Sequence, residues 1–223
     1  MKIAAVTIGQ SPRSDIVSEI ADILGPDIEL MEAGALDGLD DGQIREMLAR
    51  PGERLLVTRL RDGREVKVAE EPVARRLMET IGRLKCEDIA AVILLCTGEF
   101  PEIPSRLPLI QPGRLLRDTA RSLMAGARLG VVVPAVEQIP ALRDRWTASG
   151  FDVVVEALSP CTSSPAEIRE TAAAVAHSGV DLVVLDCIGF DTRIRSVFRT
   201  VTGKPVLLPR TLAARVAREL AGL

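Results

Sequence analysis

Two cysteines in this 223-residue chain follow aliphatic segments, and their type and placement suit them to acid–base chemistry. Cys96 follows the aliphatic residues 92–95, and Cys187 follows the aliphatic residues 182–185 and Asp186. A free thiol titrates at about 8.5, close enough to neutrality to accept or supply a proton after modest tuning. Two thiols on opposite sides of one carbon could act as a base that removes a proton and an acid that delivers one to the other face.

The residues directly after each thiol are suited to holding a ligand. Thr97 and Gly98 follow the first thiol, and Ile188 and Gly189 follow the second. Because glycine lacks a side chain, backbone amides beside it can approach a ligand closely. The Thr97 hydroxyl could donate a hydrogen bond to a carboxylate, or it could serve only to stabilise a turn.

A third candidate segment follows the first aliphatic stretch of the chain. Ser11 and Arg13 stand between that stretch and an amphipathic segment. A hydroxyl, the amides of a helix N-terminus and a guanidinium could together bind a carboxylate. The alternative is simple helix capping with a solvated arginine. With the two thiols, this segment predicts a site for a small carboxylate-bearing molecule.

Packing is the competing explanation for every thiol, because cysteine is among the most frequently buried residues. Cys86 lies between a predicted helix and a predicted strand and is assigned to packing. Cys161 lies in a polar segment and is assigned to a loop or to packing. Cys96 and Cys187 differ from these two only in their matching contexts.

Three other polar residues are assigned structural roles. Asp186 adjoins the second thiol in an extended segment, so its side chain is expected on the opposite face, as a helix cap or as the partner of an arginine. Glu99 is expected to be a solvated loop carboxylate. His177, the only histidine, belongs to a predicted helix end, which argues against a catalytic triad.

The elements that must position these residues follow an α/β pattern, because short aliphatic stretches alternate with longer amphipathic ones. Strands are expected at 2–8, 28–32, 88–95, 128–133, 152–157, 181–185 and 205–208, and helices at 14–24, 43–49, 71–84, 136–149, 165–178, 191–200 and 211–220. Ser14 or Asp15 could cap the first helix. Asp62-Gly63 lies between two extended segments and predicts an antiparallel hairpin over 54–69.

The second half of the chain repeats the pattern of the first. Residues 3–8 and 129–134 share a pattern of mostly small and aliphatic residues. Residues 92–100 align with residues 182–190, and in this alignment the two cysteines are offset by one position. The fold class predicted is α/β, with two similar parallel-sheet lobes and the hairpin inserted in the first. The lobes are assigned to 1–127 and 128–223, and the last helix could pack back on the first lobe. Coincidence of two βαβ units remains the alternative.

Composition excludes several classes of function. The net charge is −3 and aromatic residues make up 2% of the chain, which argues against binding to nucleic acid. No segment has the ~18–20 apolar residues of a membrane helix, and the first residues do not form a signal peptide. With one histidine, no CxxC pair and no glycine-rich phosphate loop, no metal or cofactor is expected. We expect a cytoplasmic protein, and the hairpin could pair with a second copy in a homodimer.

The chain resembles the AroM family over nearly its whole length. The resemblance lies in residues 3–13, the 54–69 hairpin, the strand that ends at Cys96-Thr97, and the segment 184–190. More distantly the chain is similar to the aspartate/glutamate/hydantoin racemase superfamily. That similarity implies two α/β lobes, one catalytic cysteine from each and no cofactor. Ser11 matches the substrate-contacting N-terminal loop of that superfamily.

Two departures from the superfamily pattern concern the grip on the substrate. The first cysteine there is commonly followed by Asn-Thr, whereas Cys96 is followed directly by Thr97. The second commonly has a histidine nearby, whereas Cys187 precedes Ile188 and Gly189. The function predicted is a cofactor-independent isomerase or racemase acting beside a carboxylate through two cysteines. The alternative is a non-catalytic binding or sensor protein that uses the same cleft between the lobes.

Overall fold

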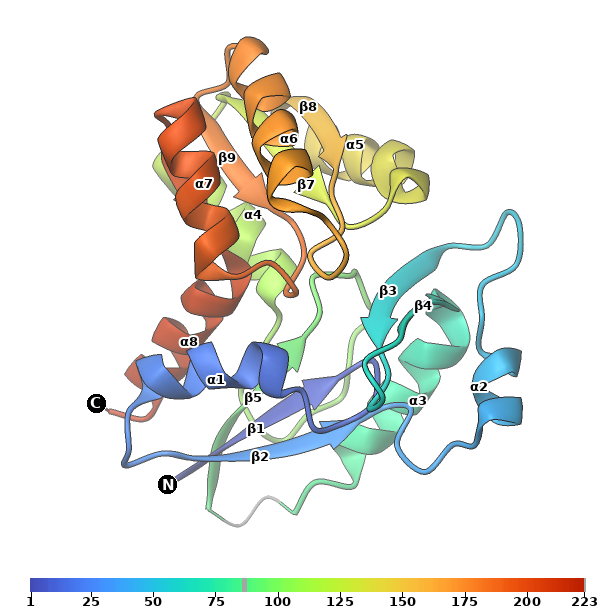
Figure 1. Ribbon diagram of the computed structural model, residues 1–223. Coiled ribbons are helices and arrows are strands. Elements are labelled where there is room, and N and C mark those ends of the chain that lie inside the picture. The colour runs from blue at the N-terminus through green and yellow to red at the C-terminus, as the bar shows by residue number, and fades with distance from the viewer. Residues whose placement is uncertain (86–87, 223) are drawn as a thin grey trace. The chain divides into compact units, whose positions relative to one another are not determined.

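Parallel strands from the two halves of the chain form two separate sheets in the computed structural model, which describes residues 1–85 and 88–222 (Figure 1). Internal contacts divide the chain into two compact units, here called the first lobe (residues 1–111 and 213–223) and the second lobe (112–212). The domain limits 1–127 and 128–223 stay predictions, because contacts within one chain do not test which segments fold on their own.

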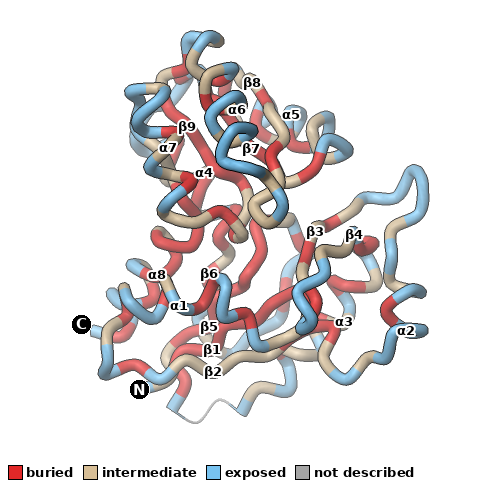
Figure 2. Tube along the Cα trace, viewed as in Figure 1, coloured by how far each residue is buried: buried red, intermediate tan, exposed pale blue. Residues whose placement is uncertain are grey.

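The sheet of the first lobe has the strand order β2-β1-β5-β6, and all its pairs are parallel. Its elements are β1 (Lys2–Thr7), α1 (Ser14–Leu24), β2 (Glu29–Gly34), α2 (Asp41–Glu46), α3 (Glu70–Gly82), β5 (Ile89–Leu95) and β6 (Leu109–Ile110). Ala4 and Val6 pack in one cluster with α3, while the alternate residues Ile3 and Ala5 are also fully buried. The sheet is therefore covered on both faces, as the buried β1 and β5 in Figure 2 illustrate.

The second lobe has a sheet of the same kind, with the order β10-β9-β7-β8. Its elements are α4 (Pro112–Leu123), β7 (Arg128–Val133), α5 (Ile139–Ala148), β8 (Asp152–Ala157), α6 (Pro165–His177), β9 (Leu182–Leu185), α7 (Thr192–Thr202) and β10 (Val206–Leu207). The helix α8 (Pro209–Leu220) begins in this lobe and continues into the segment grouped with the first. The predicted α/β class with two parallel sheets is confirmed.

The predicted hairpin is present in the first lobe as β3 (Leu55–Arg59) and β4 (Glu65–Ala69), with Arg59 opposite Glu65. Gly63 in its turn has φ +89°, a backbone conformation that favours glycine. Both edges of the hairpin meet other segments of the same lobe. The amide of Gln10 donates to the carbonyl of Arg59, and Leu48 forms a bridge with Val68. Pairing of the hairpin with a second copy stays a prediction.

Several local expectations differ from the structure. The N-cap of α1 is Arg13 and makes no side-chain cap, so the prediction that Ser14 or Asp15 caps this helix is wrong. The helix predicted at 43–49 is α2, which begins earlier because Asp40 accepts a hydrogen bond from the Gln43 amide and forms a capping box. The strand β6 was not predicted, because two residues give no periodic pattern. The helix α4 was not predicted either. Among the described residues, no helix combines the length and hydropathy needed to span a bilayer.

Strand register makes the two cysteines equivalent. Val6 of β1 lies beside Leu94, and Val132 of β7 lies beside Leu185. Superimposing β1 on β7, as residues 3–8 and 129–134 require, places Leu94 on Leu185 and therefore Cys96 on Cys187. The predicted alignment, in which the two cysteines are offset by one residue, is thus wrong. Two runs of similar aliphatic residues can be aligned in more than one way, so their sequences alone do not fix the register.

Candidate functional site

The first thiol lies where β5 ends, on the face of the sheet that packs against α3. Cys96 is 8% exposed and belongs to the same apolar cluster as Leu56 of the hairpin and Phe100. Its sulfur accepts a hydrogen bond from the backbone N–H of Gly98 at 3.2 Å. A Cβ on Gly98 would lie 2.8 Å from Cδ2 of Leu56, so the glycine lets this hairpin side chain approach the thiol loop closely.

Ser11 lies after β1, which neighbours β5, but its donors hold a carboxylate of the protein itself. The backbone N–H and Oγ of Ser11 donate to the two carboxylate oxygens of Asp37 at 2.8 and 2.6 Å. Asp37 also accepts from the Gly34 amide at 2.7 Å and lies 3.5 Å from a guanidinium nitrogen of Arg61. In this structure Ser11 therefore binds a carboxylate of the same chain, that of Asp37.

Arg13 is buried, at 5% exposure, and its guanidinium is also paired internally. Nε and one terminal nitrogen donate to the two oxygens of Asp15, both at 2.9 Å, and the other terminal nitrogen donates to the Thr7 hydroxyl. A bidentate pair of this kind holds the planar guanidinium in one orientation. The solvated arginine considered from the sequence is therefore wrong, and Arg13 stabilises the loop that carries Ser11.

The second thiol lies two residues after the last residue of β9. Cys187 is half-buried and packs against the cluster formed by β9, α6 and α7. Its sulfur accepts from the backbone N–H of Gly189 at 3.4 Å, as the first sulfur does from Gly98. A Cβ on Gly189 would lie 2.8 Å from Cγ of Pro160, so the loop after β8 approaches this thiol through the glycine.

A buried arginine donates hydrogen bonds to backbone carbonyls of the second thiol loop. Arg210 is 1% exposed at the start of α8, and it donates from Nε to the Ile188 carbonyl at 3.0 Å and from a terminal nitrogen to the Gly189 carbonyl at 2.7 Å. Sequence reasoning missed Arg210. A comparison within the chain could have drawn attention to this residue. Residues 112–123 resemble residues 209–220, with Pro112 opposite Pro209, and Arg210 is the arginine that replaces Gly113 in the second copy.

Two aspartates flank the second thiol, one on each side along the chain. Asp186 is 3% exposed and accepts from the indole N–H of the fully buried Trp146 at 2.8 Å. As expected, Asp186 points away from the face of Cys187, but the sequence did not indicate Trp146 as a partner. Asp191 caps α7 by accepting from the Ile194 amide. Burial alone would raise the pKa of Asp191, but that hydrogen bond, with Arg193 and the charge of Arg210, lowers it.

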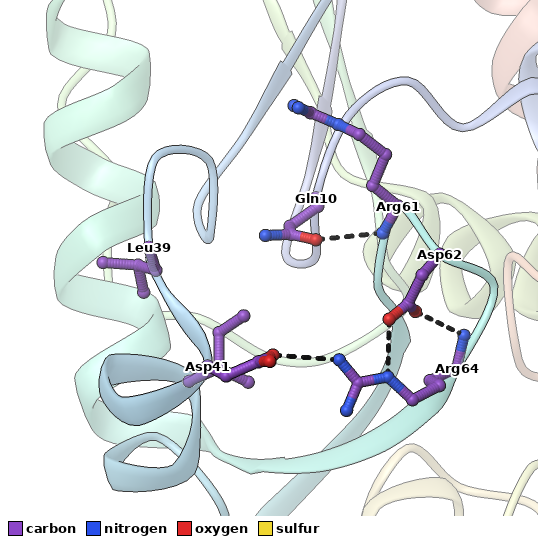
Figure 3. Close-up of a pocket in the computed structure, with 7 residues that line it drawn as sticks. Gln10, Leu39, Asp41, Arg61, Asp62 and Arg64 are labelled. Carbon is purple, nitrogen blue, oxygen red and sulfur yellow. Dashed lines mark hydrogen bonds and ion pairs between the residues drawn. The ribbon is translucent and has the colours of Figure 1, made fainter.

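The first lobe also has an open polar pocket of about 340 Å³ beside the hairpin turn (Figure 3). Its lining residues are Gln10, Leu39, Asp41, Ile44, Arg61, Asp62 and Arg64. Arg64 donates to both aspartates, and the hydrogen bonds from its backbone and side chain lower the pKa of Asp62. None of the predicted site residues lines this pocket. Its charged side chains already have partners, since Arg64 pairs with Asp41 and Asp62, and Arg61 pairs with Asp37 outside the lining.

The structure therefore gathers the predicted residues into two groups, one in each lobe. Cys96, Thr97 and Gly98 lie at the carboxyl end of the first sheet with Ser11 and Arg13, and Cys187, Ile188 and Gly189 lie at that end of the second. Cys161 is half-buried in the loop after β8, and Cys86 lies outside the described residues. Within residues 1–85 and 88–222, no three histidine, cysteine or acidic side chains are arranged to hold a metal ion.

Solved structures of racemases and isomerases share this fold over the whole chain. Allantoin racemase from Klebsiella pneumoniae is 13% identical, with a TM-score of 0.63 and coverage of 100% of this chain and 88% of that one. Aspartate racemase from Picrophilus torridus is 13% identical, with a TM-score of 0.59 and coverage of 100% and 95%. A maleate cis-trans isomerase variant from Nocardia farcinica, which carries a covalently bound succinylcysteine intermediate, is 15% identical, with a TM-score of 0.65 and coverage of 100% and 93%.

The family assignment depends on sequence, because identities this low establish the fold alone. No curated protein sequence matches the chain. A family model described as AroM protein matches residues 3–221, which include both thiol loops and the hairpin. The resemblance that the sequence motifs indicated is thereby confirmed, and the chain belongs to the AroM family.

Proposed function

We propose that this protein is an isomerase or racemase that acts at a carbon beside a carboxylate, with Cys96 and Cys187 as its acid and base. The observation that carries the proposal is the repeated Cys-x-Gly arrangement at equivalent positions of the two sheets. In each lobe the sulfur accepts an N–H from the glycine two residues later. Ligands of parallel α/β sheets bind at the carboxyl ends of the strands, which is where both thiols lie.

The proposed reaction exchanges one proton between the substrate and each sulfur. A thiolate removes the proton from the carbon, and the electron pair left behind is delocalised into the adjacent carboxylate. The other thiol then donates its own proton to the opposite face of the same carbon. The carbon is inverted, the two sulfurs have exchanged protonation states, and no cofactor takes part.

A single-thiol mechanism is a related option, in which one sulfur forms a covalent bond to the substrate. The succinylcysteine in the maleate cis-trans isomerase is an adduct of this kind in a protein of the same fold. Addition of a thiolate to a carbon–carbon double bond leaves a single bond about which the substrate can rotate, and elimination then regenerates the thiolate. Only one of the two cysteines would be essential in that case.

A non-catalytic binding or sensor protein is the second candidate function, and the first lobe offers an observation in its favour. The Ser11 donors hold Asp37, and the Arg13 guanidinium holds Asp15. The polar groups expected to hold a substrate carboxylate are therefore engaged within the protein.

The deciding experiment incubates the protein in deuterated water with aspartate, allantoin or maleate and follows each compound by proton NMR and chiral chromatography. We expect deuterium incorporation or isomerisation that is abolished in both Cys96→Ala and Cys187→Ala. Cys161→Ala is the matched control, because it removes a half-buried thiol with no assigned role, and it should retain turnover.

Each other outcome has its own meaning. Full turnover in both alanine variants would refute the two-thiol mechanism. Loss in only one variant supports the single-thiol option. Saturable binding by calorimetry without exchange or isomerisation supports the binding protein.

A further inference from the structure

The support behind the two thiol loops differs, and the difference concerns which sulfur carries the charge. We infer that Arg210 is a positioning residue that keeps the Gly189 N–H directed at Cys187 and so makes Cys187 the thiolate of the pair, with Cys96 as the thiol. This inference rests on the proposed function, and it deepens that function by assigning the base.

The first step of the argument is the geometry of one peptide group. The carbonyl of Ile188 and the N–H of Gly189 belong to the same planar trans peptide, so they point in opposite directions. Arg210 donates to that carbonyl at 3.0 Å, and the N–H on the other side donates to the sulfur of Cys187 at 3.4 Å. The guanidinium therefore fixes the donor on the sulfur through a single rigid unit.

The second step is electrostatic. A cation bonded to a carbonyl polarises the peptide, which makes the N–H on its far side a stronger donor. A stronger donor, and a positive charge behind it, favour the charged form of a thiol. Arg210 is buried at 1% exposure, where charges are weakly screened. It also bonds the Gly189 carbonyl at 2.7 Å, which holds the next peptide as well.

The neighbouring charged groups act on this field without reproducing its geometry. Asp191 opposes the charge of Arg210, and Arg193 pairs with Asp191 at 2.8 Å. Asp186 is on the opposite face of the strand, bonded to Trp146, and Arg195 donates to the Thr211 hydroxyl. Arg210 is the group among these that has a hydrogen bond to the peptide whose N–H meets the sulfur.

The first thiol has different neighbours. In the likeness between residues 112–123 and 209–220, Gly113 of α4, which has no side chain, stands at the sequence position that Arg210 has in α8. Cys96 lies in an apolar cluster with Leu56 and Phe100, and a low-polarity setting favours the neutral thiol. Both sulfurs thus accept an N–H from a glycine and contact apolar residues, and Cys187 differs in being less buried and in lying on a loop whose carbonyls accept hydrogen bonds from Arg210.

The test measures alkylation of each cysteine by iodoacetamide across a range of pH, resolved by mass spectrometry of the peptides. In the wild-type chain, Cys187 should reach its half-maximal rate at a lower pH than Cys96. Arg210→Gln should move the Cys187 midpoint upward and lower its alkylation at neutral pH about tenfold, the factor for one pH unit. Arg210→Lys, which keeps the charge, should restore much of the rate. Arg195→Gln is the matched control and should leave both midpoints in place.

A merely structural role for Arg210 gives a different result. Loosening of the loop would change the Cys187 rate by the same factor at every pH and leave the midpoint where it is, and that outcome overturns the inference. If Arg210→Gln does not fold, the Gly189 amide resonance of the wild-type chain provides the second measurement. It should shift with the Cys187 midpoint, and an amide that does not respond overturns the inference. Because alkylation needs no substrate, these results are independent of whether turnover is found.

Discussion

The loop after β5 and the loop after β9 present their sulfur atoms through the same local geometry and are supported by different neighbours. Gly98 and Gly189 donate to the sulfurs at 3.2 and 3.4 Å. The first loop packs against Leu56 from the hairpin, whereas the second packs against Pro160 and accepts hydrogen bonds from Arg210. Equal strand register places the thiol, and the segments that differ between the halves decide its surroundings.

The same register identifies two further contrasts. Superposition of β5 on β9 places Leu95 on Asp186 and Phe100 on Asp191. In both pairs an apolar residue of the first lobe thus corresponds to a carboxylate in the second, which is buried at Asp186 and half-buried at Asp191. The carboxylates have partners that the first lobe does not need, namely the Trp146 indole and the first turn of α7. A polar group placed in a core requires such partners, because burying it without them is costly.

The largest effect is expected from adding one methyl group to the glycine of each thiol loop. In Gly189→Ala the new Cβ would meet the rigid ring of Pro160 at 2.8 Å, whereas in Gly98→Ala it would meet the flexible end of Leu56 at the same distance. We expect Gly189→Ala to lower the free energy of unfolding by about 1–3 kcal/mol, and Gly98→Ala to cost less because leucine can change rotamer.

Urea unfolding of the two variants measures this contrast. Gly82→Ala is the control, because a Cβ there has nothing within 4 Å, and it should be neutral or stabilising. Equal losses at Gly98 and Gly189 would show that the two loops are packed with the same rigidity and would remove this part of the comparison.

A second effect concerns the buried carboxylate that the first lobe lacks. Trp146→Phe removes the indole N–H that donates to Asp186 at 2.8 Å, and it should cost about 2 kcal/mol because a buried carboxyl oxygen loses its hydrogen-bond donor. The double variant Trp146→Phe with Asp186→Leu gives this position the side chain that the first lobe has at Leu95. Denaturant unfolding should show the double variant to be more stable than Trp146→Phe alone. A less stable double variant would mean that Asp186 stabilises the lobe through other contacts.

The smallest effect is expected at the cap of α7. Asp191→Ala should lower the free energy of unfolding by about 1 kcal/mol near neutral pH, because the cap on the Ile194 amide is lost. The pKa of Asp191 is lowered from its ordinary value of 3.8, since the Ile194 hydrogen bond and Arg193 outweigh the effect of burial. Its contribution is therefore present above 3.8 and is lost as the pH falls below that value.

Thermal unfolding at several pH values follows this prediction. The difference between the wild-type chain and Asp191→Ala should narrow as the pH falls below 3.8, and Asp181→Ala is a control aspartate of the same lobe that is not a helix cap. A difference that grows under acidic conditions would contradict the direction of the pKa shift.

Much of the fold could be predicted from residue patterns. The aliphatic stretches at 88–95 and 128–133 match β5 and β7 closely, and Asp62-Gly63 located the hairpin turn. Short elements and helix ends were harder to predict from the sequence. The two-residue strand β6 has no measurable period. The N-cap position of α1 is an arginine, Arg13, whose side chain donates to Asp15 and Thr7 and does not cap the helix.

The sequence by itself determined the alternation of strands and helices, the two thiols at strand ends and the glycines that follow them, because these depend on residue type and short-range periodicity. Tertiary structure alone decided that the two cysteines occupy the same register, that Asp37 binds Ser11 across 26 residues, and that Arg210 supports the loop of Cys187. Those contacts join segments far apart in the chain, and many residues of suitable type compete for each one. Only folding, which excludes water and fixes a single packing, selects among them.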